Sequence, residues 1–271
     1  MLVSCLLPTY GRIPRFTYLL EEAVESFLRQ TYPDKELIIC NDTPGQRLIY
    51  HHPQVRVINA NDRFPTLGEK LHFMLEKANG DYICRWDDDD ISLPWRLDYS
   101  VAKLYNLTWK PSNIGTSHML SQHKNPILKE WRPENHWYCP RGGVPSVTTN
   151  PGNTHIAAIW HRSIILDVGV TYPGCSCPSG LEDQTFTAHL RSLGYPMFGD
   201  VLPVEDIFYL YRWGVSNNHL SGQGGGETMQ TTYRSIGAVP PLQGEFEIKP
   251  QWHRNYLADI QEAIDYLRGK S

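Results

Sequence analysis

Long hydrophobic runs are absent from this 271-residue sequence. No stretch of 18 consecutive apolar residues occurs, so no transmembrane helix is expected. The N-terminal segment also lacks the basic region and the long apolar core of a signal peptide. Together these absences predict a cytoplasmic protein, and they leave peripheral contact with a membrane open.

An excess of positive charge is missing as well. The chain has 25 Lys and Arg residues against 29 Asp and Glu residues, a formal net charge of −4 at pH 7. Nucleic-acid-binding proteins in general neutralise phosphates with Lys and Arg side chains, so no nucleic-acid partner is expected. With 41% hydrophobic and 20% charged residues, the composition is that of a globular protein. The length fits one large α/β domain or two small ones.

The six cysteines lack the spacing of a zinc site. Cys175 and Cys177 are separated by one residue, which is too few for the usual zinc-binding patterns. Cys5, Cys40 and Cys84 lie in apolar, strand-like runs, where a free cysteine behaves as a small hydrophobic residue. We expect reduced thiols in a reducing compartment, with a disulfide at Cys175 or Cys177 as the alternative.

What the chain does contain is a run of four consecutive aspartates, Asp87 to Asp90, directly after the apolar stretch 81–86. Tyr, Ile, Cys and Trp in that stretch predict a short, half-buried strand. Four like charges at a strand end repel one another unless a cation offsets them, and Mg²⁺ or Mn²⁺ prefers carboxylate oxygens. A solvated acidic loop is the alternative, which the ordered, apolar residues 91–95 disfavour.

The first 90 residues alternate between strand and helix patterns. Helical spacing of apolar residues predicts helices over 15–30 and 68–78, and apolar runs predict strands over 2–7, 36–40, 55–58 and 81–86. This order is typical of a mainly parallel sheet covered by helices, in which ligands bind at the carboxyl ends of the strands. The polar clusters at these ends are Pro8-Thr9-Tyr10, Asn41-Asp42 and the four aspartates, and together they predict a binding site.

The second half of the chain gives weaker signals. Residues 107–152 are rich in Pro, Trp, His and Asn and predict long loops with short strands. Further patterns predict strands over 155–160 and 207–213, and helices over 163–168, 182–193 and 255–268. Residues 221–227 hold four glycines but lack the Lys-Ser/Thr of a P-loop, so we interpret them as a flexible lid or a linker.

Three tryptophans in the second half have two interpretations. Trp131, Trp137 and Trp160 could form a platform on which a sugar stacks, because flat apolar rings suit the C–H faces of sugars. Packing in the core is the alternative, and it is the favoured role for each of them.

Several motifs occur along the chain in one order, and together they carry a resemblance to a known family. They are Leu6-Leu7-Pro8-Thr9-Tyr10, Gln30-Thr31-Tyr32-Pro33, Asn41-Asp42, Gly68-Glu69-Lys70, Ala78-Asn79-Gly80-Asp81 and Asp87-Asp88-Asp89-Asp90, with weaker matches at Gly180-Leu181-Glu182-Asp183 and Tyr211-Arg212. The sequence resembles the inverting family 2 glycosyltransferases, closely over about the first 100 residues. The resemblance implies a single α/β domain with the GT-A (Rossmann-like) fold, a mixed, mainly parallel sheet flanked by helices.

The resemblance also implies an activity and an organisation of the chain. A hexosyl or hexosaminyl group would pass, with inversion, from a nucleotide-diphosphate sugar to a carbohydrate or other hydroxyl acceptor. Uridine diphosphate is the favoured nucleotide, and a guanosine or thymidine donor is left open. Residues 1–106 would bind the nucleotide sugar, residues 107–220 would bind the acceptor and supply the base, and residues 221–271 would form a Gly-rich loop and a C-terminal helical tail.

For the donor, the resemblance implies a set of nucleotide-binding residues: Pro8, Thr9, Tyr10, Arg12, Asp42, Lys70, Asp87 and Asp88. Asp42 would hydrogen-bond the base, Asp87 would lie near the ribose, and Lys70 would neutralise diphosphate charge. Asp87 and Asp89 match the two acidic positions of the family's D-x-D motif. Asp89 would bind the Mn²⁺ or Mg²⁺ ion that bridges the diphosphate.

For the acceptor, Asp183 matches the family's general base, with Glu182 beside it. Asp90 and Arg212 would support the metal site or face the acceptor, with Arg212 as a phosphate ligand, and His219 would be a further metal ligand. Each has an alternative. Asp183 could be an acid stabilised by a helix N-terminus, Arg212 a buried ion-pair partner, and His219 a surface or structural histidine.

The sequence departs from the family's pattern at two places. Asn41-Asp42 stands where the family often has two aspartates, and Leu71-His72 stands where many members carry Arg-Asn. The first change keeps the second acid, and the second removes a phosphate-binding arginine from the predicted helix 68–78.

Two other function classes compete with a glycosyltransferase. A nucleotidyltransferase would carry a Gly-rich, basic loop directly after the first strand, whereas the loop here, from Pro8 to Arg12, is short and poor in glycine. A carbohydrate- or nucleotide-binding module without catalysis is the other alternative. The presence of Asp89 and Asp183 argues against it.

Overall fold

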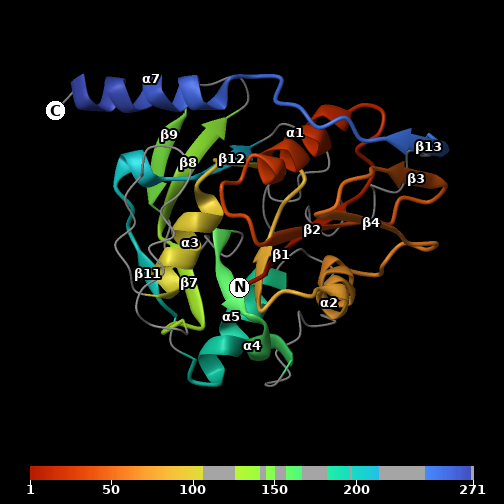
Figure 1. Cartoon of the computed structure of the whole chain (residues 1–271), viewed down its shortest axis with the longest axis horizontal. Coiled ribbons are helices and arrows are strands. Elements are labelled where there is room, and N and C mark those ends of the chain that lie inside the picture. Colours follow the sequence, from red (N-terminus) through yellow and green to blue (C-terminus); the bar gives the residue numbers. More distant parts are fainter. Residues whose placement is uncertain are drawn as a thin grey trace, which may run out of the picture.

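A seven-stranded sheet runs through the centre of the protein (Figure 1). The structure is a computed structural model, which describes residues 1–105, 126–140, 145–149, 157–166, 182–195, 197–213 and 242–269. The strand order in the sheet is β11-β7-β10-β5-β1-β2-β4. Its strands are β1 (Val3–Thr9), β2 (Lys35–Asn41), β4 (Val55–Asn59), β5 (Tyr82–Arg85), β7 (Glu130–Pro133), β10 (Ile159–His161) and β11 (Gly199–Asp200).

The N-terminal part of this sheet is parallel. β1 pairs in parallel with both β2 and β5, and β2 pairs in parallel with β4. β10 then pairs antiparallel to β5 and to β7, which makes the sheet mixed. Every residue of β1 is buried, as expected for a parallel strand covered on both faces.

Helices cover both faces of the sheet, because successive side chains of a strand point to opposite sides. Leu7 of β1 packs in one buried cluster with Val24 of α1, whereas the neighbouring Leu6 packs in a second cluster with Leu71 of α2 and Phe186 of α5. Figure 1 shows α1 and α2 on opposite sides of β1 and β2. The helices are α1 (Thr17–Leu28), α2 (Leu67–Lys77), α3 (Arg96–Leu104), α4 (Arg162–Leu166), α5 (Glu182–Ser192) and α7 (Tyr256–Gly269).

Local signals fix the position of α2. The hydroxyl of Thr66 accepts a hydrogen bond from the backbone N–H of Glu69 at 3.1 Å and so caps the first turn. After the helix, Gly80 passes so close to β1 that a Cβ atom there would lie 2.7 Å from the backbone nitrogen of Ser4. A side chain at position 80 would therefore push α2, with Lys70, away from the sheet.

A second, four-stranded sheet has the order β6-β12-β8-β9, and a two-stranded sheet joins β13 to β3. Their strands are β3 (Gln46–Ile49), β6 (Ile91–Ser92), β8 (Asn135–Pro140), β9 (Ser146–Thr149), β12 (Tyr209–Trp213) and β13 (Gly244–Glu247). β6 follows the four aspartates at once and pairs antiparallel with β12. The aspartates are therefore held between the large sheet and the second sheet.

The predicted α/β fold with a mainly parallel sheet is confirmed, and the helices and strands expected in the first 90 residues are present. The short strands β3 and β6 were not predicted. Trp131, Trp137 and Trp160 have side chains that are at most 1% exposed, so they pack in the core and are not available to stack on a sugar. Cys5, Cys40 and Cys84 are free and buried, as expected.

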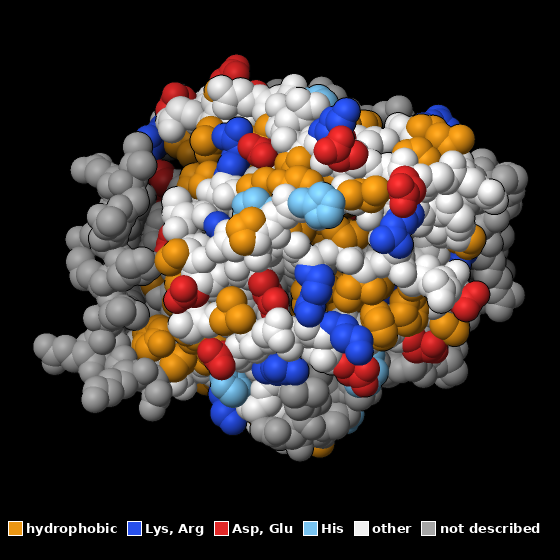
Figure 2. Space-filling view, turned by 45° about the vertical axis from the view of Figure 1, so that its right-hand side comes forward, with side chains coloured by type: hydrophobic (Ala, Val, Ile, Leu, Met, Phe, Trp, Pro, Cys, Tyr) orange, Lys and Arg blue, Asp and Glu red, His pale blue; other side chains and the backbone are white. Residues whose placement is uncertain are grey.

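On the face shown in Figure 2, basic and acidic side chains are interspersed with apolar ones. Such a mixture agrees with the small net charge of the chain. Within the described ranges, no helix has the length and apolar character that crossing a membrane requires.

Candidate active site

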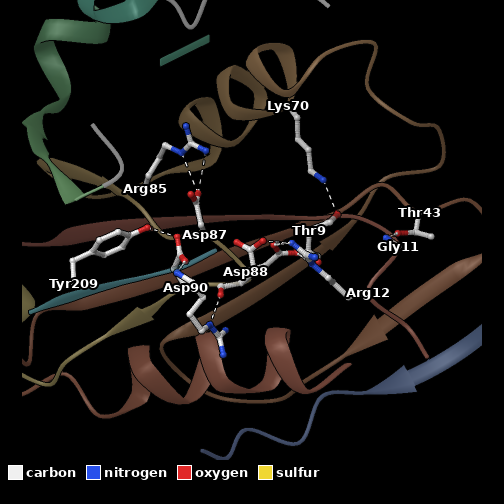
Figure 3. A network of polar contacts seen from close by, with 12 residues as sticks. Thr9, Gly11, Arg12, Thr43, Lys70, Arg85, Asp87, Asp88, Asp90 and Tyr209 are labelled. Atoms are coloured by element: carbon white, nitrogen blue, oxygen red, sulfur yellow. Dashed lines mark hydrogen bonds and ion pairs between the residues drawn. The ribbon is translucent and has the colours of Figure 1, made fainter. Parts of the chain in front are cut away.

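Three polar loops meet at the carboxyl edge of β1, β2 and β5 (Figure 3). Thr9 at the end of β1 lies in register with Asn41 at the end of β2, and Leu6 of β1 lies in register with Arg85, the last residue of β5. The convergence expected from the sequence is therefore present. Gly11, with a positive φ of 64°, turns the first loop so that its N–H donates to the hydroxyl of Thr43 at 2.8 Å.

Arg12 lies against the middle of the aspartate run. Its Nε donates to Oδ2 of Asp88 at 2.8 Å, and its Nη2 donates to Oδ1 of Asp88 at 2.5 Å and to Oδ2 of Asp89 at 2.9 Å. All three side chains are less than 10% exposed. Burial lowers the pKa of the Arg12 guanidinium, but the two carboxylates outweigh it and the pKa is raised above its usual value. Arg12 therefore remains charged and offsets part of the repulsion between the aspartates.

Asp87 is the most accessible aspartate of the run. Its side chain is 17% exposed, against 7–8% for Asp88 and Asp89, and Asp90 is buried. Its Oδ1 accepts from Nη2 of Arg85 at 3.1 Å and from Nε at 3.2 Å. Burial raises the pKa of Asp87, and the charges of Asp89 and Asp88 raise it further, against the lowering effect of Arg85. Of these carboxylates, that of Asp87 is best placed to meet a ligand that enters from solvent.

Asp90 has partners of another kind. Its carboxylate accepts from the hydroxyl of Tyr209 and, at 2.7 Å, from the backbone N–H of Arg212, and both donors lie on β12. Burial raises the pKa of Tyr209, and the nearby charge of Asp90 raises it further, so the hydroxyl keeps its proton and donates. Asp90 thus fastens the aspartate run to the second sheet.

Arg212 lies behind the aspartates as a buried ion-pair partner, the alternative that its sequence context left open. Its Nε donates to the backbone carbonyl of Asp89, and its Nη1 donates to the carboxylate of Glu22 on α1 and, at 3.0 Å, to the hydroxyl of Tyr256 on α7. Sequence reasoning did not identify Glu22, Tyr209 or Tyr256, because their partners are more than 40 residues away in the chain. The available signal for Glu22 was an acidic residue placed between the apolar residues Leu19 and Ala23 of the predicted helix.

Lys70 and Asp42 form a second buried pair at the same edge. The Nζ atom of Lys70 lies 2.6 Å from Oδ1 of Asp42 and donates to the backbone carbonyl of Thr9, also at 2.6 Å. The other carboxylate oxygen of Asp42 accepts from the N–H of Phe64 at 3.1 Å. Lys70 therefore ties the ends of β1 and β2 together, and its charge lies at the carboxyl edge of the sheet.

Tyr10 lies at the mouth of the first loop, half-buried, with the guanidinium carbon of Arg63 4.0 Å from its ring centroid. Pro8, the residue before Thr9, is buried within β1. The partly exposed ring of Tyr10 therefore follows directly on Thr9, whose carbonyl accepts from Lys70. Arg63, which comes from the loop between β4 and α2, was not identified from the sequence.

The donor set for a metal ion consists of carboxylates from the aspartate run. Within the described ranges, no group of three or more His, Cys, Asp or Glu side chains is arranged to hold a metal ion. Mg²⁺ is commonly held by one or two carboxylates together with substrate phosphates and waters. Asp87 and Asp89 fit that pattern in chemistry, and Arg12 contacts the carboxylate of Asp89 in this structure.

Several predicted site residues cannot be placed with their side chains. Glu182 and Asp183 form the first turn of α5, and their side chains lie outside the described residues. His219, the glycines of 221–227, and Cys175 and Cys177 also lie outside the described residues. The roles expected for Asp183, Glu182 and His219 stay predictions.

Comparison with known proteins gives one family. The family model described as Glycosyl transferase family 2 matches residues 4–108. The putative glycosyltransferase EpsE of Bacillus subtilis (strain 168) is 39% identical over 93 residues, which are 31% of this chain and 33% of EpsE. The O-antigen biosynthesis glycosyltransferase WbnJ of Escherichia coli is 29% identical over 130 residues, 46% of this chain and 50% of WbnJ. The chain thus spans a third to a half of the length of these relatives.

Solved structures show the fold. Residues 1–349 of TarS from S. aureus, in complex with UDP-GlcNAc, superpose with a TM-score of 0.51 at 16% sequence identity. The match covers 85% of this chain and 61% of the TarS chain. A second TarS structure, in complex with UDP, gives the same TM-score at 15% identity and covers 87% of this chain and 69% of that one. The fold is therefore GT-A.

Proposed function

We propose that this chain, whose residues 4–108 match the model of Glycosyl transferase family 2, transfers a hexosyl or hexosaminyl group from a nucleotide-diphosphate sugar to an acceptor hydroxyl with inversion. One observation supports the proposal above the others. Thr9, the Lys70–Asp42 pair and the aspartate run meet at one edge of the sheet, and all lie inside the segment that matches the family. In open α/β sheets this edge is where nucleotides bind.

For the nucleoside, the proposed pocket lies at the end of β1, at Pro8, Thr9 and the aromatic ring of Tyr10. The carboxylate of Asp42, held in place by Lys70 and the N–H of Phe64, would accept a hydrogen bond from the base. A base with an N–H on its recognised edge, such as uracil, suits this acceptor. The UDP and UDP-GlcNAc complexes of TarS support a uridine nucleotide as the first donor to test.

For the diphosphate, we propose that Asp89 holds Mn²⁺ or Mg²⁺, that Asp87 faces the ribose, and that Asp88 acts through Arg12. A metal ion bound there would offset the negative charge that grows on the leaving diphosphate. Lys70 and Arg12 add positive charge at the same edge. These cations favour the departure of a nucleoside diphosphate without a proton donor.

For the acceptor, we propose that Asp183 takes the proton of the attacking hydroxyl. The hydroxyl oxygen forms a bond to the anomeric carbon as the bond from that carbon to the diphosphate oxygen breaks, so one in-line displacement inverts the centre. Asp183 belongs to the first turn of α5, and a carboxylate is one of the groups that serve as a general base. Glu182 and His219 would support the base and the metal. Asp90 and Arg212 would set the shape of the aspartate run.

The experiment that tests this function is a panel of nucleotide sugars, with binding and hydrolysis measured with and without Mn²⁺. Wild-type protein is compared with Asp89→Ala. We expect one donor to bind in the presence of metal, and we expect the variant to lose at least about tenfold in affinity, since it loses a charged metal ligand. Absence of binding by every donor under every metal condition would contradict the proposal.

A further inference from the structure

The contact between Arg12 and Asp89 places a permanent positive charge on the carboxylate that is proposed to hold the metal. We infer that Arg12 makes metal binding depend on the diphosphate: it holds Asp89 in the absence of nucleotide and turns to the diphosphate when the donor arrives. This inference rests on the proposed function, and it concerns the order in which that site fills.

The hydrogen bonds of Arg12 are of two kinds, a two-bond contact with Asp88 and a single bond to Asp89. Two bonds, from Nε and Nη2, hold the two oxygens of Asp88 in a fork at 2.8 and 2.5 Å. One bond, from Nη2, reaches Oδ2 of Asp89 at the longer distance of 2.9 Å. A small rotation of the guanidinium could therefore release Asp89 while Arg12 keeps at least one bond to Asp88. The fork also fixes the position from which Arg12 returns.

The charges explain why the metal alone would bind weakly. A Mg²⁺ ion lies about 2.1 Å from a carboxylate oxygen, so on Oδ2 of Asp89 it would stand within about 5 Å of Nη2, given the 2.9 Å contact. Both groups are cationic, and the Arg12, Asp88 and Asp89 side chains are buried, where water screens little. A diphosphate supplies two or more negative charges, which attract the metal and the guanidinium together. When the diphosphate binds, the metal ion and the guanidinium of Arg12, which otherwise repel each other, both contact the same anion.

The other cations at this edge have different partners. Lys70 is held by Asp42 and the carbonyl of Thr9, and Arg85 is held by Asp87. Arg212 reaches Asp89 through its backbone carbonyl and not through its carboxylate. Among the described residues, Arg12 on the loop after β1 contacts the Asp89 carboxylate directly, so its movement would change the availability of that carboxylate.

The test measures Mn²⁺ affinity from the electron paramagnetic resonance signal of the free ion, with and without saturating UDP. The association of Mn²⁺ with UDP alone is measured in buffer and subtracted. In wild type we expect UDP to raise Mn²⁺ affinity by at least about tenfold, and Mn²⁺ to raise UDP affinity by the same factor, because coupling between two ligands is reciprocal. In Arg12→Met, Mn²⁺ should bind about tenfold more tightly without UDP, and the coupling should fall below about threefold.

Two further variants complete the design. Arg15→Met removes an exposed arginine from the same loop and should behave as wild type. Arg12→Lys keeps a charge but cannot hold Asp88 in a fork and reach Asp89 at once, so its coupling should lie between wild type and Arg12→Met. Thermal melting checks that each variant is folded, and Arg12→Lys decides the matter if Arg12→Met does not fold.

The outcomes separate this inference from the proposed function. If wild type binds UDP and Mn²⁺ cooperatively but the folded Arg12 variants show the same Mn²⁺ affinity and the same coupling, the role of Arg12 is wrong and the proposed function stands. If wild type binds UDP equally well with and without Mn²⁺, Arg12 serves as a fixed counter-charge and the inference is also wrong. If wild type binds neither UDP nor any nucleotide sugar, the proposed function itself fails.

Discussion

Two buried arginines lie on either side of the aspartate run, and they contact it in different ways. Arg12 binds the carboxylates of Asp88 and Asp89 directly from a loop at the edge of the sheet. The guanidinium of Arg212 binds a backbone carbonyl of the run and the side chains of Glu22 and Tyr256. Under the role proposed for Arg12, a ligand can replace the charge on its side of the run, whereas the guanidinium of Arg212 is buried against Glu22 and Tyr256.

The difference teaches how one short acidic segment serves two purposes. Asp88 and Asp89 are held by the guanidinium of Arg12, which the proposed metal and diphosphate would replace. Asp90 is held by a hydroxyl and a backbone N–H, and both of these donors belong to β12. The first pair suits a binding site, and Asp90 keeps the backbone of the run in one place while that site changes.

The largest expected effect tests whether Arg212 belongs to the fold. Arg212→Met would leave Glu22, 2% exposed, without its buried counter-charge, and should lower the free energy of unfolding by about 3–5 kcal/mol. Chemical denaturation measures the change. The control is Arg268→Met, since the pair of Arg268 with Glu205 is 59% and 47% exposed and should matter by less than about 1 kcal/mol. If Arg212→Met lost no more stability than Arg268→Met, Arg212 would not be a structural arginine, and its contrast with Arg12 would be wrong.

A second test uses pH on the β12 side of the run. His136 on β8 is buried beside the rings of Tyr209 and Tyr211, and burial lowers its pKa to about 4. The unfolded chain binds a proton below about pH 6.5, which the native protein takes up only near pH 4, so stability is lost as pH falls through this interval. The loss should reach about 3 kcal/mol in wild type and be absent from His136→Phe.

The measurement for this prediction is the free energy of unfolding at several pH values between 4 and 7. The exposed His51 provides the control, because His51→Phe should keep the pH dependence of wild type. Parallel curves for wild type and His136→Phe would show that the native protein protonates His136 readily, and that water reaches this side of the run.

The smallest effect sharpens the role of Asp90. Tyr209→Phe removes the hydroxyl that donates to Asp90 and keeps the buried ring. The carboxylate keeps the N–H of Arg212, so the loss should be about 2 kcal/mol. Tyr18→Phe, at a ring that is 39% exposed, should change stability by less than about 0.5 kcal/mol. A loss in Tyr209→Phe as small as that of the control would mean that Asp90 does not depend on this bond.

Much of the fold could be predicted, because its signals are local. Helix α2 shows its apolar spacing and its Thr66 cap in the sequence, and the parallel strands require the ends after Thr9, Asn41 and Arg85 to meet. The partners across the site could not be predicted. The pairing of β6 with β12 and the contact of Arg12 with Asp88 join residues far apart in the chain, and their side chains give no periodic pattern.

The hydrogen bond from Tyr209 to Asp90 has a consequence for the synthesis of the protein on the ribosome. The two residues are 119 positions apart, so at 5–20 residues per second a ribosome needs roughly 6 to 24 seconds to add the partner after Asp90 itself. During that time the acidic run emerges with the parallel strands but without the hydroxyl and the N–H that later hold it. A nascent chain of this length therefore presents its most highly charged segment before its last anchor exists.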